Sequence, residues 1–333
     1  MSEPTARLDE AGNLALSART IPVPSSISAA AQAFLRTTYA GSGLTPTGSG
    51  EDFKRGIAAF NEGFLQMMAP FLKTMPVTIE KAAMAGVTVY VATPNALPAA
   101  NRAKVNFAIH GGGLVLLGGE AVAFDAAASA MRGNCRSVSL DYRMPPDHPY
   151  PAALDDCLAV YRALLSQHAA NDIFISGSSA GGNLAGAVCL RIRDEGLPLP
   201  AAVLLMTPEL DLTESGDSFQ TLRDIDVVLK KGLPEFNALY AGGHDLAHPY
   251  LSPLFGDFSK GYPPTFIQTG TRDLFLSNSA RMHRALCNAG VPAELHVWEA
   301  MPHGGFGGMS PEDADVRLAV GRFLAQYAGV SGA

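Results

Sequence analysis

The chain has 333 residues, of which 47% are hydrophobic and 17% are charged. This composition is too apolar for a disordered protein and too poor in charge for a coiled coil, and the length allows a large core without disulfides or metals. Lys and Arg number 24 against 31 Asp and Glu, a net charge of −7. The acidic balance argues against nucleic acid and against an anionic membrane surface as partners.

The cysteines form no metal-binding motif, because no Cys-x-x-Cys pair and no histidine at metal-ligand spacing accompanies them. They are Cys135, Cys157, Cys189 and Cys287. We therefore expect reduced thiols and no metal ion. The first residues, Met1-Ser2-Glu3-Pro4, lack the charged and apolar regions of a signal peptide, and no apolar window is long enough to span a membrane. These features predict a cytoplasmic protein.

The predicted elements begin with a helix-like stretch at 29–35, and residues 52–72 have apolar side chains at helical spacing. From about residue 80, short apolar runs alternate with segments of helical length. The expected strands are 87–92, 105–109, 136–140, 173–176, 202–206, 265–268 and 294–298. The expected helices are 124–132, 152–166, 183–194 and 279–289. This alternation predicts an α/β protein with a mostly parallel sheet and helices on both faces.

One segment, 211–248, interrupts the alternation with helix-like material at 225–239, broken near Gly232 and Pro234, and no clear strand. We expect it to be an insertion that lies over the sheet. Together with the N-terminal residues 1–50, which end in a Gly/Ser/Thr-rich run at 41–50, it would form a helical cap. The remaining domain would then comprise residues 51–333 and include this cap insertion.

A candidate nucleophile lies in Gly177-Ser178-Ser179-Ala180-Gly181, which matches G-x-S-x-G between an expected strand and an expected helix. That context is typical of a nucleophile elbow, a strained turn that exposes the Ser179 hydroxyl above the sheet. The alternative interpretation is an ordinary helix start with small residues for packing.

A glycine loop, His110-Gly111-Gly112-Gly113, follows another expected strand. Bare backbone N–H groups in such a loop can bind a developing oxyanion. Gly112 and Gly113 are the expected donors, with the N–H of Ala180 as the third. His110 and Gly111 would support the loop. The alternative, a phosphate-binding loop, is disfavoured because no Gly-Lys-Ser/Thr follows.

Two further residues complete a candidate triad. Asp273 and His303 each follow an expected strand, so the chain order is Ser179, Asp273, His303, as in α/β-hydrolases. Two other acids, Glu209 and Asp211, also follow a strand and compete for the role of the acid. We favour Asp273 because it precedes the histidine by one helix and one strand.

Together these motifs resemble the hormone-sensitive-lipase-like family of α/β-hydrolases, the bacterial family IV esterases, over about residues 80–330. The most specific match is the tract 141–156, which is similar to the family's YR-x-x-PE-x-PFPAALDD stretch; segments 252–255 and 301–303 also match. The resemblance implies an α/β-hydrolase fold with a helical cap. It also implies a serine-dependent carboxylic ester hydrolase that forms an acyl-enzyme from short to medium acyl esters without a cofactor.

Three departures from the family pattern bear on the substrate. Ser178 stands where the family has Asp or Thr, and Glu209 stands where it has Trp, so either residue can tune substrate choice. Glu209 can equally be part of a structural pair. The acid motif at 273–278 lacks a proline and is similar to that of monoterpene ε-lactone hydrolases.

The sequence leaves several alternatives open. A lactone hydrolase would use the same triad, and an amidase cannot be separated from an esterase by these motifs. A non-catalytic binding protein of the same fold would lose triad groups, which this chain keeps. The expected partner is a small-molecule ester or lactone, and the resemblance leaves a homodimer open.

Overall fold

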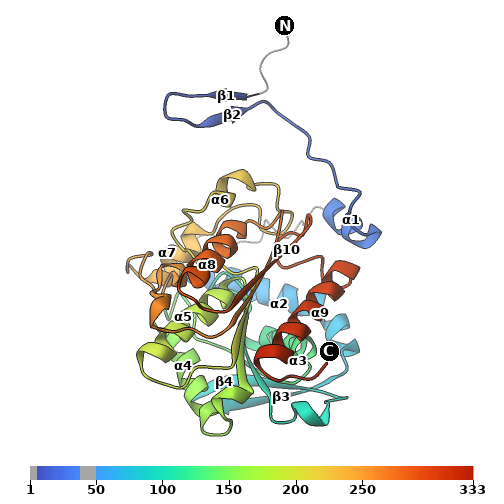
Figure 1. The fold of residues 1–333 in the computed structure, drawn as a ribbon, viewed down its shortest axis with the longest axis vertical. Helices are drawn as coiled ribbons and strands as arrows, with labels where there is room; N and C mark the ends of the chain where they lie inside the picture. Colours follow the sequence, from blue (N-terminus) through green and yellow to red (C-terminus); the bar gives the residue numbers. More distant parts are fainter. Residues whose placement is uncertain (1–5, 38–49, 333) are drawn as a thin grey trace.

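An eight-stranded sheet forms the centre of the computed structural model, which describes residues 6–37 and 50–332 (Figure 1). The strands are β3 (Val77–Met84), β4 (Val87–Pro94), β5 (Val105–Ile109), β6 (Arg136–Leu140), β7 (Ile173–Ser178), β8 (Ala202–Met206), β9 (Thr265–Gly270) and β10 (Ala293–Trp298). Their order across the sheet is β10-β9-β8-β7-β5-β6-β4-β3. Among the described strands of this sheet, β3–β4 and β4–β6 pair antiparallel and the other neighbours pair parallel. The predicted mostly parallel sheet and α/β-hydrolase fold class are confirmed.

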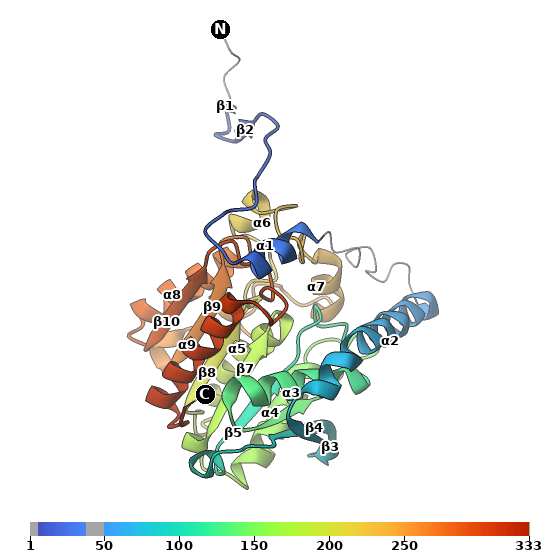
Figure 2. The ribbon, with the colours of Figure 1, turned by 90° about the vertical axis from the view of Figure 1, so that its right-hand side faces the viewer.

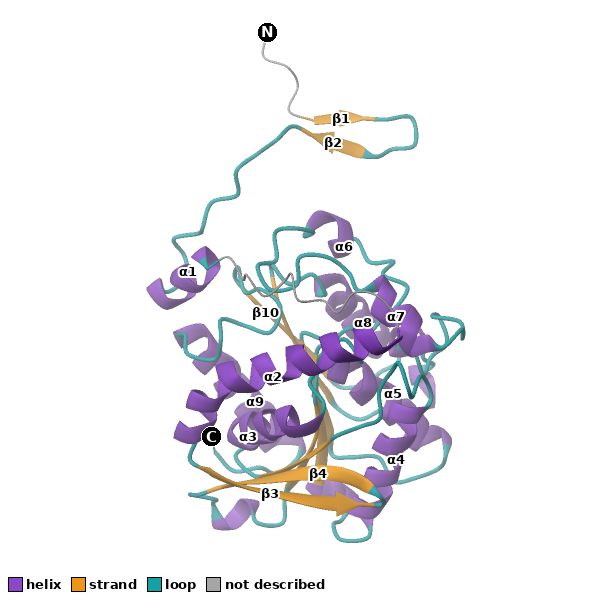
Figure 3. Ribbon diagram, turned by 180° about the vertical axis from the view of Figure 1, so that it is seen from behind, coloured by secondary structure: helices purple, strands orange, loops and turns teal. Residues whose placement is uncertain are grey.

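Helices cover both faces of this sheet (Figure 2). One face carries α3 (Val122–Gly133) and α9 (Pro311–Tyr327), and the other carries α4 (Ala152–Leu165), α5 (Ala180–Asp194) and α8 (Leu276–Asn288). A long helix, α2 (Gly50–Thr74), lies outside α3 (Figure 3). Because both faces are covered, β5 and β8 are buried at every position. The sequence of β8 is apolar throughout and that of β5 is apolar except at Asn106, as burial on both faces favours.

The core is divided by the sheet into two parts. Successive residues of a strand point to opposite faces. In β8, Leu205 joins the core under α4, α5 and α8, whereas Leu204 joins the core under α9. Burying both sides of each central strand holds the strand ends rigidly, and the candidate site residues follow those ends.

The N-terminal region leaves the body of the molecule. A short hairpin, β1 (Ala6–Leu8) with β2 (Leu14–Leu16), stands apart from it on an extended segment (Figure 1). The chain then returns as α1 (Ala29–Arg36), whose first turn is capped by the Ser28 side chain. Ser28 also donates from its N–H and its hydroxyl to the Glu312 carboxylate in α9, both at 2.7 Å.

Between β8 and β9, the insertion contains two short helices, α6 (Ser218–Thr221) and α7 (Pro234–Ala241). The helix expected from residue 225 to the break near Gly232 is wrong, whereas α7 begins at Pro234, where the break was predicted. The Asp226 carboxylate accepts the N–H groups of Val228 and Leu229, which favours a turn, and Pro234 supplies the first residue of α7.

The helices α1, α6 and α7 lie at the same end of the sheet (Figures 1 and 2). Their position agrees with a cap, although the division at residue 50 stays a prediction. Most of the run expected at 41–50 lies outside the described residues.

Candidate active site

Ser179 occupies a strained turn between β7 and α5, with φ 56° and ψ −124°. A non-glycine residue adopts such a conformation only where its surroundings enforce it. The flanking glycines allow the turn to close. A Cβ at Gly177 would lie 2.0 Å from the Gly181 carbonyl oxygen, and one at Gly181 would lie 2.0 Å from the Ile109 oxygen. The close backbone approach around Ser179 therefore requires glycine at both positions of the G-x-S-x-G motif.

The structure brings Ser179, His303 and Asp273 together. The Ser179 Oγ lies 2.9 Å from Nε2 of His303, and Nδ1 of the same ring lies 3.1 Å from Oδ1 of Asp273. Asp273 is fully buried and accepts further hydrogen bonds from the Thr269 hydroxyl at 2.7 Å and the Phe275 N–H at 3.0 Å. These bonds fix the carboxylate, so that it can orient His303 with its proton on Nδ1.

The charges around His303 favour its protonated form. Burial lowers the pKa of His303, but the hydrogen bond and charge of Asp273 more than offset it, with smaller contributions from the charges of Asp226 and Glu209. The net pKa is raised above 6.5. His303 is therefore a stronger base than a free imidazole, which suits proton transfer from a serine.

The glycine loop lies against the elbow. A Cβ at Gly111 would lie 2.9 Å from the Ser178 carbonyl oxygen and 3.2 Å from the Ser179 Cβ. Gly112 and Gly113 have φ of +110° and +61°, a region that favours glycine. In the described chain their N–H groups donate to no backbone carbonyl, and Ala180 begins α5, where N–H groups lack helical acceptors. All three can serve an oxyanion.

His110 lies behind this loop and not beside the serine. Its ring stacks on Tyr142 with centroids 4.2 Å apart, and its Nδ1 is 2.8 Å from the Gly111 carbonyl oxygen. The Tyr142 hydroxyl donates to the His110 carbonyl oxygen at 2.9 Å. Burial lowers the pKa of His110, so the ring is neutral and supports the loop.

The two competing acids have different surroundings. Asp211 is buried but forms an ion pair with Arg281 at 2.7 Å and does not contact the histidine. Glu209 is also buried; its N–H donates to the Ser179 carbonyl oxygen at 3.1 Å. Neither oxygen of its carboxylate has a hydrogen-bond partner among the described residues. Burial and the charge of Glu214 raise the pKa of Glu209 to about 7.

Two contacts of the site were missed by the sequence reasoning, one made by Asp226 and one between Arg143 and Asp156. Asp226 accepts the His303 N–H at 3.1 Å, and nothing in the pattern of the insertion indicates this contact. The bidentate pair of Arg143 with buried Asp156 locks the tract 141–156 onto α4. That tract was recognised as a motif, and the structure gives its physical basis.

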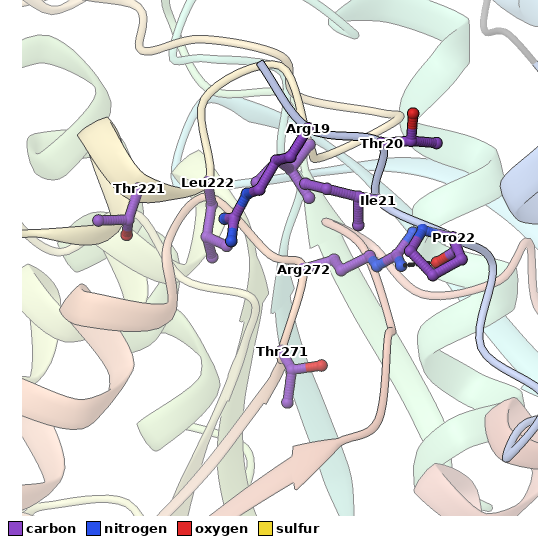
Figure 4. A pocket seen from close by; sticks show the side chains of 9 residues that line it. Arg19, Thr20, Ile21, Pro22, Thr221, Leu222, Thr271 and Arg272 are labelled. Atoms are coloured by element: carbon purple, nitrogen blue, oxygen red, sulfur yellow. Dashed lines mark hydrogen bonds between the residues drawn. The ribbon is translucent and has the colours of Figure 1, made fainter. Parts of the chain in front are cut away.

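A hollow of about 460 Å³ lies elsewhere, between the N-terminal segment, the insertion and the loop after β9 (Figure 4). Arg19 and Leu222 line it, and Arg272 there donates to the Pro22 carbonyl oxygen at 2.7 Å. Neither Ser179 nor His303 lines this hollow. In the described parts of the chain, no cluster of His, Cys, Asp and Glu side chains could hold a metal ion, and no helix could cross a membrane.

A strained serine, a histidine and a buried aspartate at the carboxyl ends of a parallel sheet define a serine hydrolase site of the α/β class. Comparison with known proteins agrees. The family model described as "alpha/beta hydrolase fold" matches residues 106–306. The chain belongs to this family and, within it, to the hormone-sensitive-lipase-like esterases.

The relatives span much of the molecule. An acetyl-hydrolase from Streptomyces hygroscopicus is 33% identical over 62% of this chain and 69% of the relative. The esterase LipI from Mycobacterium tuberculosis is 30% identical over 74% of this chain and 79% of the relative. The solved structure of esterase E25 covers 94% of this chain and 98% of its own, with a TM-score of 0.88 and 36% identity. A solved esterase of the bacterial hormone-sensitive lipase family covers 91% and 99%, with a TM-score of 0.77 and 30% identity.

Proposed function

We propose that this protein hydrolyses carboxylic esters of short to medium acyl length through a covalent acyl-enzyme on Ser179. The observation that carries the proposal is the relay from Ser179 Oγ to His303 Nε2 at 2.9 Å and from His303 Nδ1 to Asp273 at 3.1 Å. The N–H groups of Gly112 and Gly113 beside it, which donate to no backbone carbonyl of the described residues, supply the second requirement of acyl transfer.

In the first half-reaction, Nε2 of neutral His303 accepts the Ser179 proton while Oγ attacks the ester carbonyl carbon. The oxyanion that forms accepts hydrogen bonds from Gly112, Gly113 and Ala180. Asp273 stabilises the imidazolium, which then donates its proton to the departing alcohol oxygen. In the second half-reaction a water molecule, deprotonated by His303, attacks the acyl carbon. His303 then returns the proton to Ser179 Oγ as the acyl C–Oγ bond breaks, and the carboxylic acid is released.

Apolar side chains beside the oxyanion loop support an apolar acyl group. A Cβ at Gly113 would lie 2.7 Å from the Phe236 ring of α7. The buried residues Phe53, Val115 and Leu116 join Phe236 in one apolar cluster. Cyclic esters are the second candidate, supported by the acid motif without proline at 273–278. In this substrate scheme Ser178, half-buried next to the nucleophile, and Glu209 tune selectivity.

The test is a panel of p-nitrophenyl acyl esters, ε-lactones and amides with the wild type and Ser179→Ala. We expect p-nitrophenyl butyrate to be cleaved by the wild type and not by the variant, and a fluorophosphonate to add mass to Ser179 only in the wild type. Retained hydrolysis in Ser179→Ala contradicts the mechanism. A higher kcat/KM for the lactones than for open esters would assign a lactonase, and an unreactive Ser179 would assign a binding protein.

We also propose that the protein is cytoplasmic and that it forms a homodimer. All four cysteines are free thiols, which supports a reducing, cytoplasmic compartment. A homodimer is tested by light scattering of the purified chain.

A further inference from the structure

The buried carboxylate of Asp226 lies between the two loops that carry the candidate acid and base. It comes from the insertion and is 0% exposed. Its Oδ2 accepts the main-chain N–H of Leu274 at 3.0 Å and that of His303 at 3.1 Å. Its Oδ1 accepts the N–H groups of Val228 and Leu229 at 2.9 and 3.1 Å. One side chain thus accepts four backbone N–H groups from three separate segments, and the two held by Oδ2 are buried.

The contacts of Oδ2 matter for catalysis because Leu274 directly follows Asp273. The loop after β9 and the loop after β10 are 30 residues apart in sequence, and the triad needs their side chains at hydrogen-bond distance. A single oxygen that holds one N–H of each loop sets the distance between the two main chains. Misplacement by about 1 Å at such a position can cost about 100-fold in rate.

The Asp226 carboxylate also interacts electrostatically with the His303 ring. Its hydrogen-bond partners are uncharged backbone N–H groups, and the ionisable groups that interact with it are His303 and Asp273. Burial, together with the charge of Asp273, raises the pKa of Asp226, whereas the charge of His303 and the backbone N–H groups lower it. Asp226 and His303 therefore each favour the charged form of the other. The charge of Asp226 favours the imidazolium, which exists only after His303 has accepted the serine proton.

We infer that Asp226 is a positioning residue of this site, which aligns the acid and base loops through Leu274 and His303 and stabilises protonated His303. The inference rests on the proposed function of Ser179, His303 and Asp273. It makes the insertion between β8 and β9 part of the catalytic apparatus as well as part of the cap.

The test is Asp226→Asn, which keeps the shape of the side chain but removes its charge and presents an amide NH₂ group where an oxygen now accepts. We expect kcat to fall about 10- to 100-fold with KM within about twofold of the wild type. We also expect the acid limb of the pH profile of kcat/KM to move to lower pH, because losing a nearby negative charge lowers the pKa of His303. A purely structural residue would not move this limb.

The matched control is Asp211→Asn, which alters a buried carboxylate of the same insertion. Its partners are Thr213, Ser215 and Arg281, outside the triad loops. This variant should lose stability but keep the kcat and the acid limb of the wild type. A folded Asp226→Asn protein with wild-type kcat and an unmoved limb would overturn the inference.

A second variant covers the case in which Asp226→Asn does not fold. Asp226→Glu keeps the charge, so it should fold with a lower kcat and an acid limb at the wild-type position. If neither variant folds while Asp211→Asn does, the carboxylate serves folding alone and the inference fails. An inactive wild type, or an active Ser179→Ala, would instead refute the proposed function itself.

Discussion

His303 governs how activity depends on pH, because only its neutral form can accept the serine proton. Burial lowers its pKa, but Asp273 and the two other nearby carboxylates raise it above 6.5 overall. We therefore expect kcat/KM to fall on acidification, with a midpoint above 6.5 and a plateau on the alkaline side. A pH profile with p-nitrophenyl butyrate measures this midpoint, and a midpoint below that of free histidine would contradict the predicted electrostatics.

The oxyanion loop is sensitive to a single methyl group. At Gly112, φ is +110° and a Cβ would lie 2.3 Å from the Leu116 carbonyl oxygen. Gly112→Ala should therefore displace its N–H and lower kcat by about 10²–10³-fold. Gly119→Ala is the control, because φ there is +69° but nothing lies within 4 Å of the added Cβ. Steady-state kinetics of both variants distinguish a local steric effect from a general effect of positive φ.

Glu209 links stability to pH. Its pKa is about 7 in the folded protein, against 4.5 for an ordinary glutamate, because of burial and the charge of Glu214. The folded state therefore holds this proton more tightly than the unfolded chain, and the free energy of unfolding falls as pH rises between these two values. Glu209→Gln removes this loss and should be more stable than the wild type near pH 8, by on the order of 1–3 kcal/mol.

Urea denaturation of the wild type and Glu209→Gln near pH 4 and near pH 8 tests this linkage. The advantage of the variant should shrink at the lower pH, where the wild-type carboxyl is protonated in both states. An advantage of equal size at both pH values would point to packing instead of charge.

At the scale of elements, sequence patterns predicted the strands well because most are buried on both faces. The ends of β5, β6 and β8 agree with the predicted ranges 105–109, 136–140 and 202–206. Edge strand β3 was missed, since it has exposed residues at most positions and carries no apolar run. Helix α9 was also not predicted, because its charged residues obscure the helical spacing of its apolar side chains. The capping box of Ser310 and Asp313 does mark its start.

The candidate site was predictable only where chemistry is concentrated in short motifs. The spacing of the glycines in the sequence indicates both Ser179 and the loop at Gly112. Asp226 does not, because its contacts with Leu274 and His303 depend on how three distant segments pack. Long-range contacts of this kind leave no local pattern in a single sequence.

The docking of α1 combines hydrogen bonds to one carboxylate with apolar contacts. Glu312, in the first turn of α9, accepts both the N–H and the hydroxyl of Ser28, and the Phe34 ring packs edge-on against Phe306 with centroids 6.1 Å apart. Phe306 follows His303 closely, so α1 covers the histidine loop. Glu312→Gln should weaken this docking by about 1 kcal/mol.

Amide hydrogen exchange measures the effect of Glu312→Gln on α1. The amides of α1 should exchange faster in the variant, while those of the central strands β5 and β8 stay protected. Unchanged exchange in α1 would show that the apolar contacts of Ile27, Ala31 and Leu35 suffice to dock it.

At the scale of the whole molecule, the reactivity of the cysteines measures how accessible the core is on each side of the sheet. Cys157 and Cys189 lie in the core under α4, α5 and α8, and Cys135 lies in the core under α9. Burial raises the pKa of all three thiols, to about 12 for Cys135. Cys287, in α8, is the exposed cysteine. Since only an accessible thiolate attacks a disulfide reagent, a single thiol should react quickly in the native protein.

Titration with 5,5′-dithiobis(2-nitrobenzoate) tests this expectation. One thiol per chain should react in the native state, and all four in guanidinium chloride. Cys287→Ser should abolish the fast native reaction and leave three thiols after denaturation. Fast reaction of a second native thiol would mean that one core opens on the timescale of labelling. Mapping the labelled cysteine would then show which face of the sheet opens, and hence whether the layer under α9, next to the His303 loop, is the less stable part of the fold.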